Sequence, residues 1–347
     1  MLDKIKNSLA KELPFVVYAK PNTIAVNGIF QEDDTLNYLD DFSQKGFVMA
    51  PFDNASKSIL LPLDKSTQHQ ETWDLKSFTE SKTVPSSYSE TDKQKFERLV
   101  SNMISEINST KTEKIVASRK ETFIPEHINI PALFEKMFHN YPNAFRYCFY
   151  HPQVGLWLGA TPEKLLSING QHLQTMGYAG TQKLEGTTDV VWQEKERQEQ
   201  QFVTDFILQN LKEETESIDV STPYTSQAGT LLHLRTDINA RLKQDFSIER
   251  IITKLHPTPA VCGFPKQESK EYILASEGYD RSFYTGFLGE LNFTEHDNSE
   301  LYVNLRCMEI QGNEVQLYIG CGITKDSNPE KEFMETVNKS ITMKSLF

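Results

Sequence analysis

The chain has 347 residues, which is enough for two ordinary domains or one large one. Hydrophobic residues make up 38% and charged residues 24%, a globular composition that excludes a disordered, collagen-like or coiled-coil chain. The formal net charge is −12 and no block of lysine and arginine occurs, so nucleic acid and anionic membrane surfaces are disfavoured as partners. A small anionic substrate would need local cationic side chains or a metal ion to hold it.

The cysteine pattern and the apolar runs indicate where the protein works. Cys148, Cys262, Cys307 and Cys321 are widely spaced and form no C-x-x-C motif, which excludes zinc-ribbon and thioredoxin-like sites. We expect buried free thiols in a reducing cytosol, although an even count permits disulfides. No stretch approaches the ~20 apolar residues of a membrane span, and the run at residues 15–18 is too short for a signal peptide. The sequence therefore predicts a cytoplasmic protein.

The first 110 residues have the pattern of an irregular, polar lobe. Three short strands are predicted at residues 15–18, 47–50 and 59–63. Residues 79–93 are rich in serine, threonine and charge, which predicts an exposed loop or linker. Apolar residues at helical spacing then predict an amphipathic helix over residues 92–107.

The rest of the chain shows a more regular pattern of hairpins joined by helices. The predicted strands are residues 114–118, 145–151, 154–158, 165–168, 172–176, 301–310 and 314–319. Asn169-Gly170 is a strong signal for a type I′ hairpin turn. Long helices are predicted at residues 194–211 and 328–343, the second with Asn328 as its N-cap. Hairpins joined by helices, rather than alternating βαβ units, predict an α+β fold with antiparallel sheets.

Two Glu-x-x-Glu pairs lie near the starts of the two long predicted helices: Glu196 with Glu199, and Glu332 with Glu335. Three-residue spacing places both carboxylates of a pair on one helix face. Most such pairs are solvated acidic faces. Here, however, the first pair continues the inward apolar stripe of its helix, and the second shares a face with Lys339. Four carboxylates converging in a cleft would repel one another without a hard cation between them, so the alternative is a Mg²⁺ site.

Arg306 falls within the predicted strand 301–310, where alternation places it on the same face as Asn304. An arginine in a strand usually pairs with a structural acid. The alternative is a fork that holds a substrate carboxylate through two parallel hydrogen bonds.

Three segments rich in glycine or proline could shape a pocket: residues 177–181, 255–265 and 320–322. Glycines allow backbone N–H groups to approach an anion closely, and the proline-rich segment is rigid. None of the three matches a nucleotide-binding fingerprint, and nothing local marks His256 as a base.

Taken in order, these segments resemble the chorismate-utilising enzymes, which include anthranilate synthase component I and the aminodeoxychorismate, isochorismate and salicylate synthases. The matching segments are KIVASR at 114–119, GATPEKLL at 159–166, AGT at 179–181, ERQEQQFVTD at 196–205, HLRT at 233–236, HPTPAVCGFP at 256–265, DRSFYTG at 280–286, Arg306, GCGI at 320–323 and SNPEKEFMETVNK at 327–339. The first hundred residues show no such match. The resemblance implies one domain over residues 1–347, with residues 1–110 as a variable lobe and residues 111–347 as the catalytic portion. It also implies large antiparallel sheets packed as a two-layer core with helices on the outside.

Within this family, residues 256–265 are most similar to isochorismate synthases, because anthranilate and aminodeoxychorismate synthases have a Gly-Ala-Pro-type sequence there. Salicylate synthases tend to carry threonine where this chain has Ala260. The resemblance implies a monomer that converts chorismate to isochorismate with Mg²⁺, for menaquinone or siderophore biosynthesis, without a glutaminase subunit. The alternatives are a salicylate synthase, which would also eliminate pyruvate, an aminating relative, and a non-catalytic chorismate-binding protein.

The resemblance also assigns a catalytic pair. Lys114 matches the lysine that activates water in the family's isochorismate synthases, and Glu163 matches the general acid. Lys114 would have to be neutral to accept a proton, which burial or a neighbouring positive charge would favour. Glu163 would have to be protonated, which apolar or anionic surroundings would favour.

The implied metal ligands are Glu199 and Glu335, with Glu196 and Glu332 acting through water. The implied substrate-binding residues are Gly180, Thr181, His233, Ala260, Tyr284, Arg306, Gly320 and Lys339. Among these, Arg306, Tyr284 and the Gly320 backbone would hold the pyruvyl carboxylate. The family usually has Glu-His where this chain has Glu199-Gln200, and only histidine titrates near neutrality, so the surroundings of the metal ligand are expected to differ.

Overall fold

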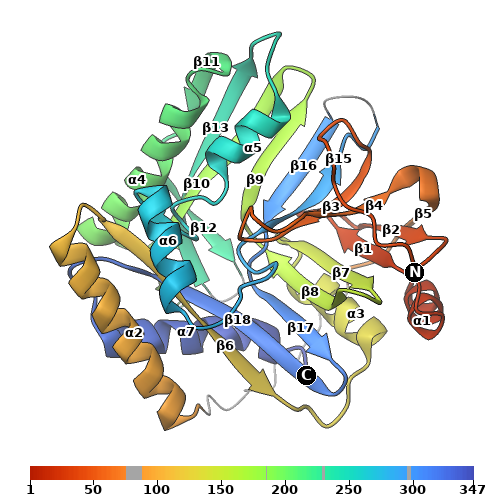
Figure 1. Ribbon diagram of the computed structural model, residues 1–347, viewed down its shortest axis with the longest axis horizontal. Coiled ribbons are helices and arrows are strands. Elements are labelled where there is room, and N and C mark those ends of the chain that lie inside the picture. Colours follow the sequence, from red (N-terminus) through yellow and green to blue (C-terminus); the bar gives the residue numbers. More distant parts are fainter. Residues whose placement is uncertain (76–87, 185, 229–230, 295–297) are drawn as a thin grey trace.

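The computed structural model describes residues 1–75, 88–184, 186–228, 231–294 and 298–347 (Figure 1). Its helices are α1 (Leu2–Ala10), α2 (Glu90–Ser109), α3 (Ile130–Asn140), α4 (Glu194–Leu211), α5 (Ile248–Leu255), α6 (Lys266–Ser276) and α7 (Pro329–Lys344), with a short 3₁₀ turn at Leu63–Lys65. None of the helices in these ranges is long and apolar enough to cross a membrane.

Within the described residues, the strands form two antiparallel sheets of nine strands each. The first sheet has the order β14 (Gly263–Phe264), β6 (Lys114–Phe123), β18 (Glu314–Ile323), β17 (Cys307–Gln311), β8 (Gly155–Thr161), β7 (Phe145–His151), β1 (Phe15–Ala19), β2 (Ala25–Gln31) and β5 (Ser66–Thr72). The second has the order β11 (Thr215–Val220), β13 (Leu231–Leu242), β10 (His172–Lys183), β9 (Lys164–Asn169), β16 (Asn298–Val303), β15 (Phe287–Leu291), β3 (Gly46–Ala50) and β4 (Ile59–Pro62), with β12 (Tyr224–Ala228) also paired to β13. The predicted α+β class is therefore confirmed.

An aromatic layer joins the two sheets. Phe145 of β7 stacks on Tyr302 of β16 with ring centroids 4.3 Å apart, and Tyr18 of β1 lies 5.2 Å from Phe47 of β3. Each of these side chains is at most 2% exposed, so each contributes roughly 1.5–3 kcal/mol of hydrophobic stabilisation. The expected two-layer core is present at this contact.

The helices cover the outer faces of this core (Figure 1). Helices α1 and α3 pack on the outer face of the first sheet, and α4 and α5 pack on the second. Helices α2, α6 and α7 surround β6 near the edge of the first sheet. Two of the helices that carry functional residues, α4 and α7, therefore approach the region between the sheets from different sides.

Most of the local predictions are confirmed. Helix α4 has the predicted bounds, and α7 begins as predicted, because the Asn328 side chain accepts a hydrogen bond from the Lys331 N–H. Helix α2 begins at Glu90, so the last residues of the predicted loop 79–93 are helical instead, and residues 79–87 lie outside the described part of the chain. All four cysteines are buried and free, as expected.

The hairpin turn between β9 and β10 differs from the prediction. Asn169 pairs with His172, which makes Gly170 and Gln171 the two central residues. Of these residues only Gly170 has a positive φ, whereas a type I′ turn requires a positive φ at both central positions. The type I′ prediction was wrong because the strand extends one residue further than the Asn-Gly signal implies.

The predicted strand 301–310 is also wrong, and this error bears on the site. β16 ends at Val303 in the second sheet, and β17 begins at Cys307 in the first. The chain changes sheets at residues 304–306, where Arg306 has a φ of 49°. Arg306 therefore does not lie on the face of a continuous strand, and the alternation that grouped it with Asn304 does not hold.

Candidate active site

A cleft with about 1080 Å³ of space outside the protein atoms, including its opening to solvent, lies where both sheets meet α4 and α7. Its walls carry every site residue expected from the sequence except Lys114. These are Glu163, Gly180, Thr181, Glu196, Glu199, His233, Ala260, Tyr284, Arg306, Gly320, Glu332, Glu335 and Lys339. Segments up to 176 residues apart in the chain thus converge on one cavity, as the resemblance implied.

Two neighbouring chain crossings between the sheets position Glu163 and Arg306. Glu163 lies in the connection between β8 and β9, and Arg306 lies in the connection between β16 and β17. Backbone hydrogen bonds tie the crossings together: the Val303 N–H donates to the Glu163 carbonyl at 3.0 Å, and the Ala160 N–H donates to the Arg306 carbonyl at 3.0 Å. Thr285, whose φ is 60°, donates its N–H to Asn304 of the β16–β17 connection. Positive φ at residues with a Cβ is sparsely populated and is concentrated at functional sites.

Glu163 is buried, with 3% of its surface exposed. Burial raises the pKa of Glu163 to about 8, although a hydrogen bond from Thr258 and the charges of Lys114 and Arg306 act in the opposite direction. At neutral pH this carboxyl group therefore keeps its proton, as a general acid must. The direction of this pKa shift is the expected one, and its cause is burial.

Lys114 begins β6 and is 2% exposed, which confirms its expected burial. Its Nζ lies 2.7 Å from Glu199 Oε1, so its neighbour is an anion and not the positive charge that was expected as an alternative. The amine reaches this position beside Gly322, where a Cβ would lie 2.8 Å from Lys114 Cε and 2.7 Å from Glu199 Oε1. Lys114 is therefore one side chain away from the cleft, behind Glu199, and also borders a second, solvent-open cavity.

The four expected metal-site carboxylates line the same cleft, and three of them are paired with lysines. Besides the Lys114–Glu199 pair, Lys339 Nζ lies 2.6 Å from Glu335, and Lys195 Nζ lies 3.4 Å from Glu332. Burial opposes ionisation of Glu199, but the charge and hydrogen bond of Lys114 outweigh it and hold the Glu199 pKa below its ordinary value.

Two observations show that these residues suit a divalent cation. Glu196 Oε2 is buried and has no hydrogen-bond partner among the described residues. Burial, and then the negative charge of Glu335, raise the pKa of Glu332. The two carboxylates therefore repel each other. Oxygen donors that are orphaned and mutually repelling fit Mg²⁺. Within the described ranges, however, no three acidic, histidine or cysteine side chains are gathered into a coordination cluster, because the lysines hold the carboxylates.

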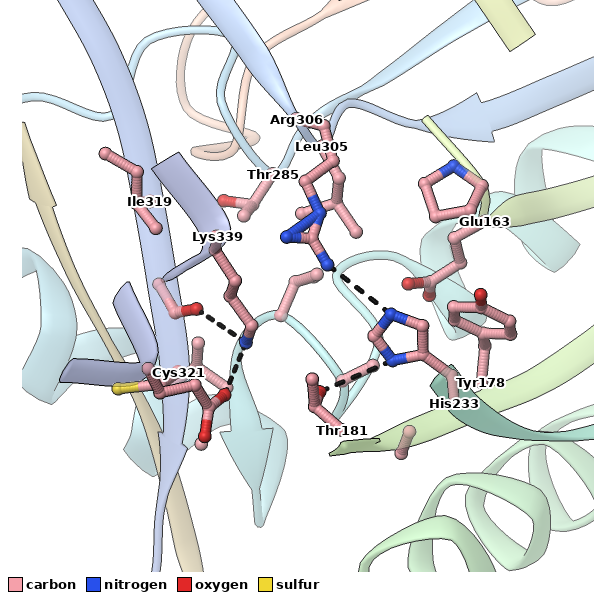
Figure 2. A pocket seen from close by; sticks show the side chains of 18 of the residues that line it. Glu163, Tyr178, Thr181, His233, Thr285, Leu305, Arg306, Ile319, Cys321 and Lys339 are labelled. Atoms are coloured by element: carbon pink, nitrogen blue, oxygen red, sulfur yellow. Dashed lines mark hydrogen bonds and ion pairs between the residues drawn. The ribbon is translucent and has the colours of Figure 1, made fainter. Parts of the chain in front are cut away.

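The opposite part of the cleft is cationic and contains a neutral histidine. Burial, followed by the charges of Arg306 and Lys339, lowers the pKa of His233 well below its ordinary value. His233 Nδ1 lies 2.8 Å from the Gly180 carbonyl and 3.3 Å from Thr181 Oγ1, so Nδ1 carries the proton and donates to the carbonyl. Figure 2 shows Nε2 on the other side of the ring, 3.5 Å from Arg306 Nη2, where it accepts.

Arg306 has no carboxylate ion-pair partner in the described part of the chain, so the reading of a structural ion pair is not supported. Its guanidinium is available at the cleft for an anionic ligand. Lys339 Nζ donates to the Gly320 carbonyl at 3.0 Å as well as pairing with Glu335, which fixes the amine at the edge of the same space (Figure 2).

Gln200, the departure from the family pattern, does not reach the carboxylates. Its Nε2 lies 2.8 Å from Thr204 Oγ1 and 2.6 Å from Thr236 Oγ1, and the residue is 2% exposed. The hydrogen bond to Thr236 ties α4 to β13, whereas Thr204 belongs to α4 itself. The amide therefore orients the helix that carries Glu196 and Glu199.

Sequence reasoning missed several residues that the fold brings to the cleft, notably Tyr178, Lys195, Thr258 and Thr285. Lys195 was visible as a basic residue between two glutamates, but the pattern placed it on a solvated face. Tyr178 lies inside a segment next to the matched AGT motif, yet nothing local shows that its hydroxyl is buried.

Comparisons with known proteins identify the family of this chain. A family model described as "Chorismate binding enzyme" matches residues 46–347, so the match begins well before residue 110, where the recognised motifs start. The isochorismate synthase EntC of Escherichia coli (strain K12) is 29% identical over 262 residues, or 73% of this chain. The match spans 66% of EntC, slightly less than two thirds of its length.

Solved structures show the same fold. The DhbC of Bacillus anthracis superposes with a TM-score of 0.81 at 24% identity, covering 100% of this chain and 99% of that one. MenF, the menaquinone-specific isochorismate synthase of Escherichia coli, gives a TM-score of 0.79 at 22% identity, covering 96% of this chain and 88% of MenF. With the family model matching most of the sequence, this chain belongs to the chorismate-binding enzymes.

Proposed function

We propose that this protein is an isochorismate synthase, which converts chorismate to isochorismate with Mg²⁺ as its cofactor. The proposal rests on two buried side chains that could act as acid and base. Glu163 lines the cleft and has a raised pKa, and Lys114 lies directly behind Glu199, which also lines the cleft. Relatives named isochorismate synthase support the same reaction.

The reaction requires an acid and a base in separate positions. Chorismate is a dianion with a ring hydroxyl at C4, and isochorismate carries that hydroxyl at C2. Water adds at C2 and loses a proton, the double bonds shift, and the C4 oxygen takes up a proton and leaves as water. Atoms and charge balance, and no oxidant or reductant is consumed.

Glu163 is the proposed donor to the leaving C4 oxygen, because its buried carboxyl keeps a proton at neutral pH. Lys114 is the proposed acceptor of the proton from the attacking water. Its amine contacts Glu199, which lines the cleft, so it lies close to the substrate space.

The binding groups match the two ends of a dianion. Arg306, with Tyr284 and the Gly320 backbone at the same wall, would hold the pyruvyl carboxylate through a fork of hydrogen bonds. Glu199 and Glu335 would hold Mg²⁺, with Glu196 and Glu332 behind them. When bound there, the ion would supply the positive charge that holds the ring carboxylate. Arg306 and the bound ion would therefore attract the dianion even though the whole chain has a net charge of −12.

The test is chromatography of the purified protein with chorismate, with Mg²⁺ or with EDTA, and with isochorismate and pyruvate measured together. Isochorismate formed only with Mg²⁺, and without pyruvate, is the expected result. Salicylate with stoichiometric pyruvate would show a salicylate synthase instead. Absence of conversion, with chorismate binding retained, would show a non-catalytic binding protein.

The product is proposed to enter menaquinone or siderophore biosynthesis. Among the relatives, one is named as menaquinone-specific and another as vibriobactin-specific. Genes adjacent to the one that encodes this chain would distinguish the two routes.

A further inference from the structure

Tyr178 presents a buried hydroxyl that makes no hydrogen bond within the described part of the chain. The residue lies in β10, paired with Arg235 of β13, and is 5% exposed. Its ring packs on His233 with centroids 4.7 Å apart. The Ser226 hydroxyl lies near enough to lower the pKa of Tyr178, but it does not meet the geometry of a hydrogen bond to the Tyr178 hydroxyl, and no other described residue does.

A buried hydroxyl without a partner destabilises the folded protein, because the group has lost its water and gained nothing in exchange. Phenylalanine would fill the same space without that cost. Tyr178 also lines the cleft and faces Glu163, as Figure 2 shows. The missing partner is therefore expected to be an atom of the ligand.

The surroundings identify which ligand atom this is. Among the groups that influence the pKa of Tyr178 are Arg306, Arg235 and Glu163. Arg306 is the proposed partner of the enolpyruvyl carboxylate, and Glu163 is the proposed donor to the C4 oxygen. In chorismate the enolpyruvyl ether and the C4 hydroxyl are on adjacent ring carbons. Because Tyr178 lies beside Glu163 (Figure 2), its hydroxyl is assigned to the oxygen that Glu163 is proposed to protonate, the C4 oxygen.

We propose that the Tyr178 hydroxyl donates a hydrogen bond to the C4 oxygen of chorismate, which makes Tyr178 a substrate-contacting residue that selects for the C4 hydroxyl. The inference rests on the proposed function and names a further residue of that site. A hydroxyl oxygen has two lone pairs, so it accepts from Tyr178 and from Glu163 at once. Burial raises the pKa of Tyr178 above its ordinary value, so the phenol stays a neutral donor.

The experiment measures binding of two non-reacting cyclic dianions that differ only in the presence of the 4-hydroxyl. The wild-type protein is expected to prefer the hydroxylated compound about tenfold, the size of one buried hydrogen bond. In Tyr178→Phe this preference should fall to within about twofold, while affinity for the compound without the hydroxyl changes little. The ligand-free Tyr178→Phe protein should be at least as stable to heat as the wild type.

The matched control is Tyr18→Phe. Tyr18 is fully buried, but its hydroxyl donates to Glu290 at 2.5 Å and lies in the aromatic layer between the sheets. This variant should lose thermal stability and keep the full preference for the hydroxylated compound. The two tyrosines thus give opposite signatures.

A Tyr178→Phe protein that keeps the tenfold preference, or that binds both compounds equally less well, would overturn the inference. Because binding is measured without turnover, the outcome is independent of the proposed activity. Loss of the preference in a protein that does not convert chorismate would sink the proposed function alone, and conversion with the preference intact would sink the Tyr178 contact alone.

Discussion

Replacing Glu163 with glutamine should stabilise the folded protein by an amount that grows with pH. The pKa of Glu163 rises from an ordinary value of 4.5 to about 8 in the folded protein, because burial disfavours the carboxylate. The folded state therefore keeps a proton that the unfolded state releases. The contribution of Glu163 to the free energy of unfolding is fully present below pH 4.5 and is lost as the pH rises to about 8. Glutamine has no proton to lose, so the variant does not suffer this loss.

The magnitude follows from about 1.36 kcal/mol for each pKa unit. Glu163→Gln should exceed the wild type in free energy of unfolding by about 1 kcal/mol at pH 5 and about 3 kcal/mol at pH 7. The difference should level off at about 5 kcal/mol above pH 8, because both states are then ionised. Any loss of the Thr258 hydrogen bond adds a term that does not depend on pH.

The assay is urea unfolding at pH 5, 7 and 9, followed by the fluorescence of the buried Trp157 and Trp192. The control is Glu330→Gln, a side chain that is 72% exposed, which should change stability by less than about 0.5 kcal/mol. A Glu163→Gln difference that stays constant from pH 5 to 9 would refute the reasoning. In the wild type, turnover should fall above about pH 8 as Glu163 ionises, and the variant should bind chorismate without converting it.

Further predictions concern the charged groups. Lys114→Gln should abolish turnover and leave chorismate affinity within about threefold by calorimetry; full activity in this variant would rule out the base. Glu335→Ala should weaken Mg²⁺ binding at least tenfold by calorimetry, and unchanged binding would remove it from the metal site. Arg306→Lys should raise the KM for chorismate about tenfold or more, because an ammonium lacks the planar fork, and an unchanged KM would count against this contact. Glu277→Gln should cost about 3 kcal/mol in urea unfolding, since it leaves the fully buried Arg281 without its ion-pair partner; a cost below about 1 kcal/mol would contradict this.

Local patterns in the sequence were sufficient for helices α2, α4 and α7 and for the hairpins β7–β8, β9–β10 and β17–β18, because the forces that set them act over a few residues. Helices α1, α3, α5 and α6 were not predicted. Helix α4 follows from apolar residues at helical spacing, and α7 begins where Asn328 caps it. The antiparallel class follows from short strands joined by tight turns. All of the site residues that the ordered motifs identified, except Lys114, line the cleft, since a family's chemistry constrains residue types at set positions.

The tertiary structure alone decided how those residues meet. Residues 301–310 alternate like one strand, but the chain changes sheets at Arg306, because packing of two sheets overrides a local pattern. The Lys114–Glu199 ion pair joins residues 85 positions apart in the sequence, so no local pattern predicts it. The raised pKa of Glu163 and the unpartnered hydroxyl of Tyr178 both depend on burial, which is a property of the assembled core and not of any local segment.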